Sequence, residues 1–393
     1  MRTERTLTRR RFLARSGVGA AALLGGGAST LAGIGTALAA PTGQLVQAAA
    51  GKGLMYGSSL ATWQYAGSEF SQPDPEYGAL HAREAGMMFT EDDLLWWRLR
   101  PSRTAALDFS YGDRIIGDAE TNAQQVFAAH MVWDSGFGDG WTEDELRSLP
   151  QQEARDLLFG TIDAEAARYA GRARAWVVAN EVVSHNRVDA NGFWTVTPWY
   201  QTIGPTHVDE AFFHARQHDP SAILVINDFG FEVGSTATGR RTNILKAIDH
   251  LQTVGADVGA LGVEAHLNYQ GFARSFNPTA YRSFLASVAS RGLHIFVTEL
   301  DVLDDGLRGD IATIDAGVAD VYKRYLDVVL QEQAVKIVIT FGLTDRYTWL
   351  QEDFPRRDGQ PRRPLPFDAN LQPKPAYNAI LQAFQGAPSR TPL

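Results

Sequence analysis

Two glutamates, Glu181 and Glu299, each stand at the end of an apolar stretch that is rich in β-favouring residues. A pair of carboxyl groups can divide acid catalysis and nucleophilic attack between them, as hydrolysis of a glycosidic bond by double displacement requires. One carboxyl group protonates the leaving oxygen and the other attacks the anomeric carbon, with the two groups about 5–5.5 Å apart. We therefore interpret Glu181 as the acid/base and Glu299 as the nucleophile of such a pair.

Three polar neighbours could support this chemistry. Asn180 directly precedes Glu181, where it could bond a sugar hydroxyl group near the reacting carbon. His266 ends another apolar stretch, where it could bond Glu299 and link it to Asp301.

Apolar stretches of this kind recur along the whole chain and predict the elements that position the glutamates. They cover Leu54–Gly57, Met87–Thr90, Val126–Trp133, Ala175–Asn180, Ile223–Asp228, Ala260–His266, His294–Leu300 and Val335–Phe341. Segments with helical periodicity, such as 208–218 and 313–331, lie between most of them. Alternating helices and fully apolar strands are typical of parallel sheets covered by helices. We predict an α/β fold, a single-domain (β/α)₈ TIM barrel, in which the carboxyl ends of the strands face one active site.

The first forty residues have the pattern of an export signal rather than of a folded segment. Thr8–Leu13 resembles a twin-arginine motif, 18–38 is only weakly apolar, and Ala37–Ala39 supplies a small-residue cleavage site. We expect residues 1–40 to direct export by the twin-arginine route to the periplasm or the medium, and residues 41–393 to form the barrel. An uncleaved membrane anchor is the alternative.

Charge and composition exclude several classes of partner. The net charge is −9, and residues 1–40 contribute +5, so the remainder carries −14. A chain this acidic is a poor partner for nucleic acid or anionic lipid. The absence of cysteine excludes disulfides, a thiol nucleophile and a Cys-ligated metal. We expect a monomer that needs no cofactor or metal and that does not associate with a membrane once the signal has been removed.

Several motifs occur in a fixed order along the chain. They are Ala48–Gly53, Trp176–Glu181, Ile226–Phe229, Gly262–His266, Val297–Asp301, Thr344–Trp349 and Pro373–Asn378. In this set, which runs from about Leu45 to Leu381, the chain resembles glycoside hydrolase family 10, the endo-β-1,4-xylanases. The resemblance implies a retaining enzyme that cleaves β-1,4-xylosidic bonds in a polysaccharide or oligosaccharide, with Glu181 and Glu299 in the roles given above.

The chain departs from the family pattern at residues that would grip the sugar. Glu91 matches a substrate-binding Glu, but Asp92 stands where Asn is usual and Leu95 where Lys is usual. Ala129 and Asp134 occupy the places of two histidines.

Further departures lie nearer the two glutamates. Glu264 replaces a Gln, and Phe341 replaces a Trp. His130 is one residue from an expected His, and because a slip of one residue on a strand reverses the side chain, we favour a structural role for it.

Aromatic rings bind sugars through the C–H faces of the pyranose. By position we assign this role to Trp96, Trp133, Phe341 and Trp349, and we assign Trp97 and Trp176 to the core.

Two other functions remain open on the sequence alone. His266, Glu264, Glu299 and Asp301 could hold a metal in a metal-dependent hydrolase, although no H-x-H or H-E-x-x-H spacing occurs. The changes at Leu95, Ala129, Asp134 and Glu264 also fit a carbohydrate-binding protein that has lost turnover. The sugar itself stays open between xylan, short xylo-oligosaccharides and a gluco-configured chain.

Overall fold

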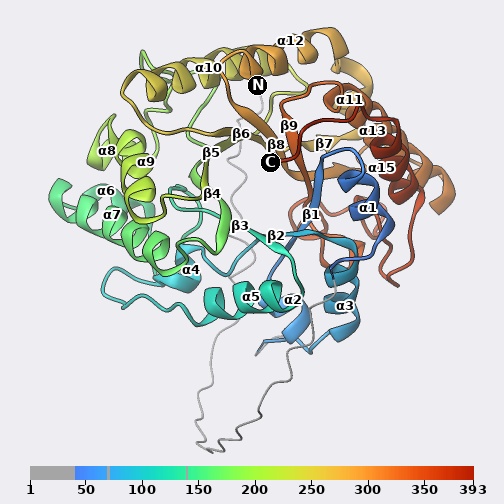
Figure 1. Cartoon of the computed structure of the whole chain (residues 1–393), viewed down its shortest axis with the longest axis horizontal. Coiled ribbons are helices and arrows are strands. Elements are labelled where there is room, and N and C mark those ends of the chain that lie inside the picture. Colours follow the sequence, from blue (N-terminus) through green and yellow to red (C-terminus); the bar gives the residue numbers. More distant parts are fainter. Residues whose placement is uncertain (1–39, 69–70, 139) are drawn as a thin grey trace, which may run out of the picture.

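The computed structural model describes residues 40–68, 71–138 and 140–393, and its strands form a closed parallel barrel (Figure 1). The strands are β1 (Met55–Leu60), β2 (Met87–Thr90), β3 (Gln125–Ala128), β4 (Ala173–Asn180), β5 (Ile223–Asp228), β6 (Ala260–Val263), β7 (His266–Asn268), β8 (His294–Leu303) and β9 (Val335–Thr340). Their order is β6-β5-β4-β3-β2-β1-β9-β8-β7, and pairing of β6 with β8 closes the ring. The predicted (β/α)₈ barrel is confirmed, with β7 as a short extra strand on β8.

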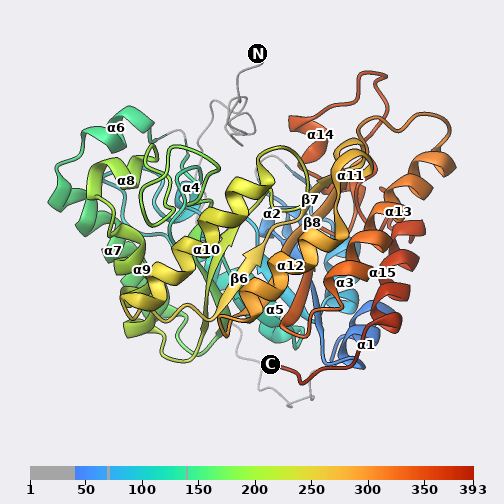
Figure 2. The ribbon, with the colours of Figure 1, turned by 90° about the horizontal axis from the view of Figure 1, so that it is seen from above.

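Helices surround the barrel and cover the outer face of its strands (Figures 1 and 2). They are α1 (Gln44–Ala50), α2 (Thr62–Ala66), α3 (Pro75–Glu84), α4 (Trp96–Leu99), α5 (Ser110–Thr121), α6 (Glu143–Ser148), α7 (Gln151–Arg168), α8 (Pro198–Ile203), α9 (His207–His218), α10 (Ala237–Thr253), α11 (Tyr269–Ser275), α12 (Pro278–Ala289), α13 (Ile311–Val329), α14 (Leu350–Asp353) and α15 (Pro375–Gly386), with a 3₁₀ turn at Asp345–Tyr347. Among the described residues, none of these helices has the length and apolarity needed to cross a membrane.

Two of the expected strands are interrupted or end early. The stretch expected to run from Ala260 to His266 is divided into β6 and β7 because Ala265 has a left-handed backbone, with φ of 59°. The stretch expected over 126–133 ends as a strand at Ala128. Both breaks occur where the chain leaves the barrel and enters the mouth.

The core has an inner and an outer layer, which follow from the alternation of side chains along each strand. On β2, Met87 and Phe89 point into the barrel, whereas Met88 packs outward against the helices. On β4, Val177 points inward and Trp176 outward. Trp176 is fully buried, as predicted.

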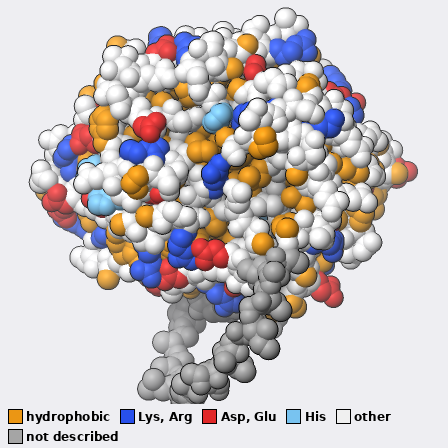
Figure 3. All heavy atoms as spheres, in the orientation of Figure 1, with side chains coloured by type: hydrophobic (Ala, Val, Ile, Leu, Met, Phe, Trp, Pro, Cys, Tyr) orange, Lys and Arg blue, Asp and Glu red, His pale blue; other side chains and the backbone are white. Residues whose placement is uncertain are grey.

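The two ends of the barrel differ in what covers them. The C-terminus lies at one end, and α11 and α14 lie at the opposite edge (Figure 2). Arg390 fastens the C-terminal tail by donating hydrogen bonds to the carbonyl groups of Leu330, Glu332 and Val335. Leu393 packs against the inner core. On the face seen in Figure 3, acidic and basic side chains are interspersed.

The predicted export signal cannot be compared with the structure, because residues 1–39 lie outside the described part of the chain.

Candidate active site

Glu299 lies on β8 at the mouth of the barrel, with only 3% of its surface exposed. Asn227 Nδ2 donates to Glu299 Oε1 at 3.1 Å, and His266 Nε2 lies 3.3 Å from Glu299 Oε2. His130 Nε2 is 3.6 Å from Oε1. Burial alone would raise the pKa of Glu299, but the contacts with His130 and His266 outweigh it and hold the pKa below its ordinary value. Glu299 is therefore an ionised carboxylate.

His266 joins Glu299 to a second buried acid, as predicted. Its Nδ1 lies 3.0 Å from Asp301 Oδ1, and Asp301 Oδ2 accepts a hydrogen bond of 2.7 Å from Trp349 Nε1. Burial would lower the pKa of His266, yet the charges and hydrogen bonds of Asp301 and Glu299 raise it well above its ordinary value. His266 is therefore a cation that donates from both ring nitrogens.

Asn227, at the end of β5, connects the polar groups of the mouth. Its Nδ2 donates to Asn180 Oδ1 at 2.7 Å as well as to Glu299, and it lies 3.3 Å from Glu264 Oε1. Its Oδ1 accepts a 2.7 Å hydrogen bond from Thr298 Oγ1. The side chain that orients Glu299 is thus in contact with residues of β4, of β8 and of the segment that follows β6.

Glu181 follows β4 directly and turns the chain sharply there, with φ of 55°. A non-glycine residue in the left-handed region is uncommon and is often found at a functional site. The Glu181 N–H donates to the Asn227 carbonyl group at 2.9 Å, which fixes this turn beside β5. Its side chain is partly exposed, whereas Asn180 is buried.

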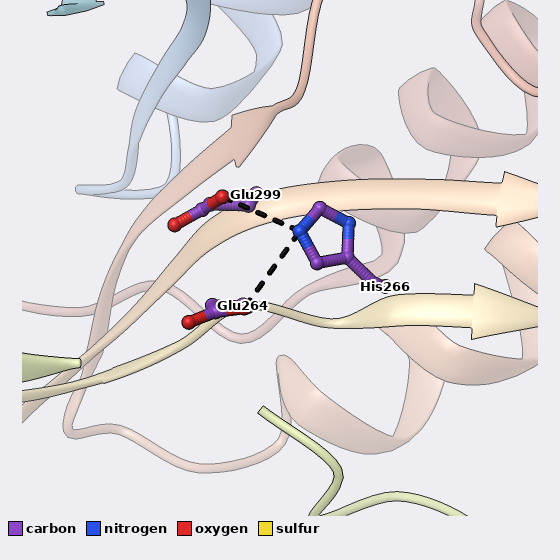
Figure 4. A group of neighbouring side chains, drawn as sticks. All are labelled: Glu264, His266 and Glu299. Carbon is purple, nitrogen blue, oxygen red and sulfur yellow. Dashed lines mark hydrogen bonds and ion pairs between the residues drawn. The ribbon is translucent and has the colours of Figure 1, made fainter. Parts of the chain in front are cut away.

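Glu264, His266 and Glu299 lie close together and form a compact charged group (Figure 4). One ligand atom from each of the three residues lies within 4.8 Å of the others, a spacing that could in principle hold a metal ion. Burial, and next the charges of Glu299 and Glu181, raise the pKa of Glu264 well above its ordinary value. Because His266 donates from both nitrogens, it has no lone pair for a metal. A metal ion at this site would therefore have to displace a proton from His266 and break its contact with Glu299 or Asp301.

A cleft of about 340 Å³ opens beside this group. Its walls come from segments that follow β1, β2, β3 and β9: Trp63, Glu91, Asp92, Leu95, Trp97, Trp133, Ser135, Gly136, Phe137, Arg346, Tyr347, Thr348, Trp349, Gln351, Glu352 and Asp353. Trp349 and Trp133 stand between the cleft and the charged group, because their rings lie 5.1 Å from His266 and 5.2 Å from His130. Six of these sixteen residues are aromatic and four are acidic, so the cleft combines ring faces with carboxylates.

The predicted residues Glu91 and Asp92 line this cleft, and both are held by other side chains. Glu91 Oε2 accepts from Ser59 Oγ at 2.7 Å and from Gln64 Nε2 at 3.3 Å. Asp92 Oδ2 accepts from Trp63 Nε1 at 2.9 Å. Both carboxylates thus have fixed positions in the wall of the cleft.

The roles expected for Trp96 and Trp97 are exchanged. Trp96 is 4% exposed and packs in the core against Trp141 and Trp199, whereas Trp97 lines the cleft. The two residues open the one-turn helix α4, on which neighbouring side chains point about 100° apart. The apolar neighbours of Trp96 therefore decide which of the two rings faces the sugar site.

Phe341 and Asp134 also have definite positions. The Phe341 ring packs edge-on to His266 at 5.4 Å, at the top of the inner core, and is 3% exposed. Asp134 Oδ1 accepts the N–H of Trp199 at the start of α8. Asp134, which stands where the family has a histidine, therefore serves the loop structure, and burial raises its pKa to about 7.

Two residues that contact Glu299 were not predicted as site residues. His130 was assigned a structural role, but it lies beyond the end of β3, where the alternation of a strand no longer applies. Asn227 was seen only as a polar residue at a strand end. The cue that could have identified it is its position between the two glutamate-bearing strands in the barrel order.

Comparisons with known proteins agree with this geometry. The profile of glycosyl hydrolase family 10 matches residues 44–383. The chain is 28% identical over 327 residues to endo-1,4-beta-xylanase B of Thermotoga neapolitana, covering 81% of this chain and 87% of that protein. It is 28% identical over 331 residues to exoglucanase XynX of Acetivibrio thermocellus, covering 82% of this chain and 28% of that protein.

A solved structure extends the likeness to three dimensions. The crystal structure of xylanase 10B from Thermotoga petrophila in complex with xylobiose matches with a TM-score of 0.74 and 27% identity, covering 87% of this chain and 97% of that one. With the family profile matching nearly the whole barrel, the chain belongs to glycosyl hydrolase family 10.

Proposed function

We propose that this protein is a retaining glycoside hydrolase that cleaves β-1,4-xylosidic bonds in xylan or xylo-oligosaccharides, with Glu299 as nucleophile and Glu181 as acid/base. The observation that carries the proposal is the environment of Glu299. Two histidines and an asparagine amide surround a buried carboxylate and keep it ionised. An ionised carboxylate beside a sugar cleft is the nucleophile that double displacement requires.

In the first step, a Glu299 oxygen forms a bond to the anomeric carbon while the bond to the leaving oxygen breaks. Glu181 transfers its proton to that oxygen, so the leaving sugar departs as a neutral alcohol. The reaction requires the Glu181 and Glu299 carboxyl groups to lie about 5–5.5 Å apart. Asn180 and Asn227, which are bonded to each other, stand beside both groups.

In the second step, Glu181 is a carboxylate and takes a proton from water. The water oxygen attacks the anomeric carbon, the ester bond to Glu299 breaks, and Glu299 returns to its anionic form. His266 and Asn227 are already in place to stabilise that anion. Both glutamates end the cycle in their starting protonation states, and the product keeps its β configuration.

The cleft supports a sugar chain as the substrate. Its segments follow β1, β2, β3 and β9, of which β9 neighbours the strand of Glu299 and β3 neighbours the strand that ends before Glu181. We assign it to the sugars on the non-reducing side of the cleaved bond. Trp133, Trp97 and Trp349 offer ring faces there, and Glu91 and Asp92 offer acceptors for hydroxyl groups.

Covalent trapping tests the assignment directly. A 2-deoxy-2-fluoro xylobioside with a good leaving group should label the protein once, on the peptide that contains Glu299. Glu181→Ala should lose about 10²- to 10⁴-fold in turnover and regain part of it with azide on an activated aryl substrate. Glu165→Gln, which alters a buried glutamate of helix α7, is the matched control and should keep the native turnover and labelling. Label on another residue, or normal turnover by Glu299→Ala, would exclude the mechanism.

A β-1,4-glycanase acting on a gluco-configured chain is the second candidate. The buried Leu95 lines the cleft where the family has a lysine, and the relative from Acetivibrio thermocellus is named an exoglucanase. Product analysis on xylotriose, cellotriose and xylan decides between the two sugars and between internal and terminal cleavage. Binding of these sugars without any hydrolysis by the native protein would favour a carbohydrate-binding protein instead.

We also infer that the protein acts outside the cytoplasm. Thr8–Leu13 carries the paired arginines of a twin-arginine signal. Replacing Arg9 and Arg10 by lysine should leave the protein unprocessed in the cytoplasm, and N-terminal sequencing of the exported native protein should begin close to Ala40.

A further inference from the structure

Glu264 and Glu299 are two buried acids that compete for the same hydrogen-bond donors (Figure 4). Asn227 Nδ2 lies 3.3 Å from Glu264 Oε1 but 3.1 Å from Glu299 Oε1. His266 Nε2 lies 3.7 Å from Glu264 Oε2 but 3.3 Å from Glu299 Oε2. Both shared donors are therefore closer to Glu299.

The donors contain too few hydrogens to serve two carboxylates. His266 Nε2 carries one hydrogen, and Asn227 Nδ2 carries two, of which one is directed to Asn180 Oδ1 at 2.7 Å. One hydrogen from each residue therefore remains for four carboxyl oxygens. His130 adds a contact at 3.6 Å, and that contact is also to Glu299. As a carboxylate, Glu264 would be buried with its charge poorly compensated.

We propose that Glu264 is a positioning residue that works as a neutral carboxylic acid, leaving His266 and Asn227 to the anionic Glu299, and that it holds its proton less tightly once Glu299 is esterified. This inference rests on the proposed function, because it assigns Glu299 a charged and an esterified state. Glu264 neither forms nor breaks a bond to substrate. Its proton is not consumed in either step of the reaction.

The charges around Glu264 determine how the proton responds to the reaction. Besides Glu299, the charged groups that face it are Glu181, Asp228 and the His266 cation. Burial and the negative charges of Glu299, of Asp228 and, once it has given up its proton, of Glu181 favour the neutral acid, whereas His266 favours the anion. When Glu299 forms a bond to the anomeric carbon, its negative charge disappears, while Glu181 gives up its proton and becomes an anion. Because the charge of Glu299 acts on Glu264 more strongly than that of Glu181, the pKa of Glu264 falls in the intermediate.

The family pattern gives the same interpretation from the residue's shape. A glutamine is usual at this position, and a protonated glutamate has nearly the same shape and no charge. An ionised glutamate would add a negative charge within 4.8 Å of the nucleophile. Glu264→Gln therefore imitates the working state of the native residue at every pH.

The pH dependence of kcat/KM on an aryl xylobioside is the first test. Glu264→Gln should match the native protein within about 3-fold at pH values where Glu264 is protonated, and it should keep activity further into the alkaline range. We expect the ratio of Glu264→Gln to native kcat/KM to rise at least about tenfold across the alkaline limb, which corresponds to one pH unit. Glu165→Gln, a buried glutamate outside the site, should follow the native profile. Superimposable alkaline limbs would overturn the proposal, as would a loss above about 100-fold at every pH by Glu264→Gln.

Difference infrared spectroscopy is the second test, and it needs no turnover. The native spectrum minus that of Glu264→Gln should contain the C=O band of a protonated carboxyl group at neutral pH. In protein trapped with the 2-fluoro xylobioside, the band should titrate at least about one pH unit lower than in the free protein. Absence of the band at neutral pH, or an unchanged titration after trapping, refutes the proposal. Failure of the native protein to hydrolyse or be trapped by any glycoside would reject the proposed function, whereas the band in the free protein would still decide whether Glu264 is protonated.

Discussion

Gly262 on β6 is the residue whose replacement tests the polar cluster most sharply. A Cβ atom at this position would lie 2.0 Å from Asn227 Oδ1 and 3.1 Å from Thr298 Cγ2. Cβ contacts shorter than 3.0 Å essentially do not occur in real proteins. Gly262→Ala must therefore displace the Asn227 amide by about 1 Å, because β6 and β5 are fixed by their ladder.

The displacement should weaken catalysis more than folding. Asn227 holds Glu299 and Asn180 together, and a misplacement of about 1 Å near the chemistry costs on the order of 10²-fold in rate. That loss corresponds to about 2.7 kcal/mol of transition-state stabilisation. Overpacking should cost a further 1–3 kcal/mol or so of unfolding free energy. Measurement of kcat/KM on an aryl xylobioside and a denaturant titration separate the two effects.

A double-mutant cycle shows whether the effect passes through Asn227. In an Asn227→Ala background the added methyl group has no amide to displace, so Gly262→Ala should then cost little more. Gly160→Ala is the matched control, because a Cβ there meets no atom within 4 Å and the glycine lies within helix α7. If Gly262→Ala kept native kcat/KM, or if its cost were unchanged without the Asn227 amide, the reasoning would be refuted.

Three other predictions concern proton binding, the cleft wall and metals. Burial raises the pKa of Glu165 well above its ordinary value of 4.5, so the folded protein keeps a proton that the unfolded chain releases above that pH. The free energy of unfolding should therefore fall by up to about 1.4 kcal/mol per pH unit above pH 4.5. In denaturant titrations below and above pH 4.5, the free energy of unfolding of Glu165→Gln should decline less steeply with pH than that of the native protein. Trp349→Phe keeps a ring in the cleft but removes the 2.7 Å hydrogen bond to Asp301. The value of kcat/KM should therefore drop about 5- to 30-fold, with little change in melting temperature. An unchanged kcat/KM would show that this hydrogen bond has no role in catalysis. Dialysis against a chelator should leave turnover unchanged, because His266 offers no lone pair to an ion; activity that is lost and then restored by a divalent cation would contradict this.

The barrel was predictable because its signal is repeated and local. Each strand is apolar almost throughout. Asn180 and Asp228 are the last residues of β4 and β5, and Glu299 lies just beyond the point where β8 stops pairing with β6. Since parallel strands share one mouth, positions far apart in sequence could be assigned to one site without knowledge of the loops. The bond from His266 to Glu299 and Asp301 followed from the same argument.

The rest of the site depends on geometry that no short pattern encodes. The contact of His130 with Glu299 arises after β3 has ended, where the rule of alternating faces gives the wrong side. The exchange of Trp96 and Trp97 depends on which ring the core accepts beside Trp141. The position of the Asn227 side chain depends on contacts with residues of β4, of β8 and of the segment after β6, so it could be known only once the ring was assembled.

The seam between β1 and β9 has a consequence for the synthesis of this protein. There Ser58 donates to the Thr340 carbonyl group across 282 residues of sequence. Closing so long a loop is slow, and the contacts that offset its entropy cost can form only after the last strand has been made. Glu91 and Trp349 reach the cleft from opposite sides of this seam. A nascent chain that ends before β9 therefore has no complete sugar cleft. Hydrolytic activity should appear in one step, after β9 has been made, rather than increase gradually with the length of the chain.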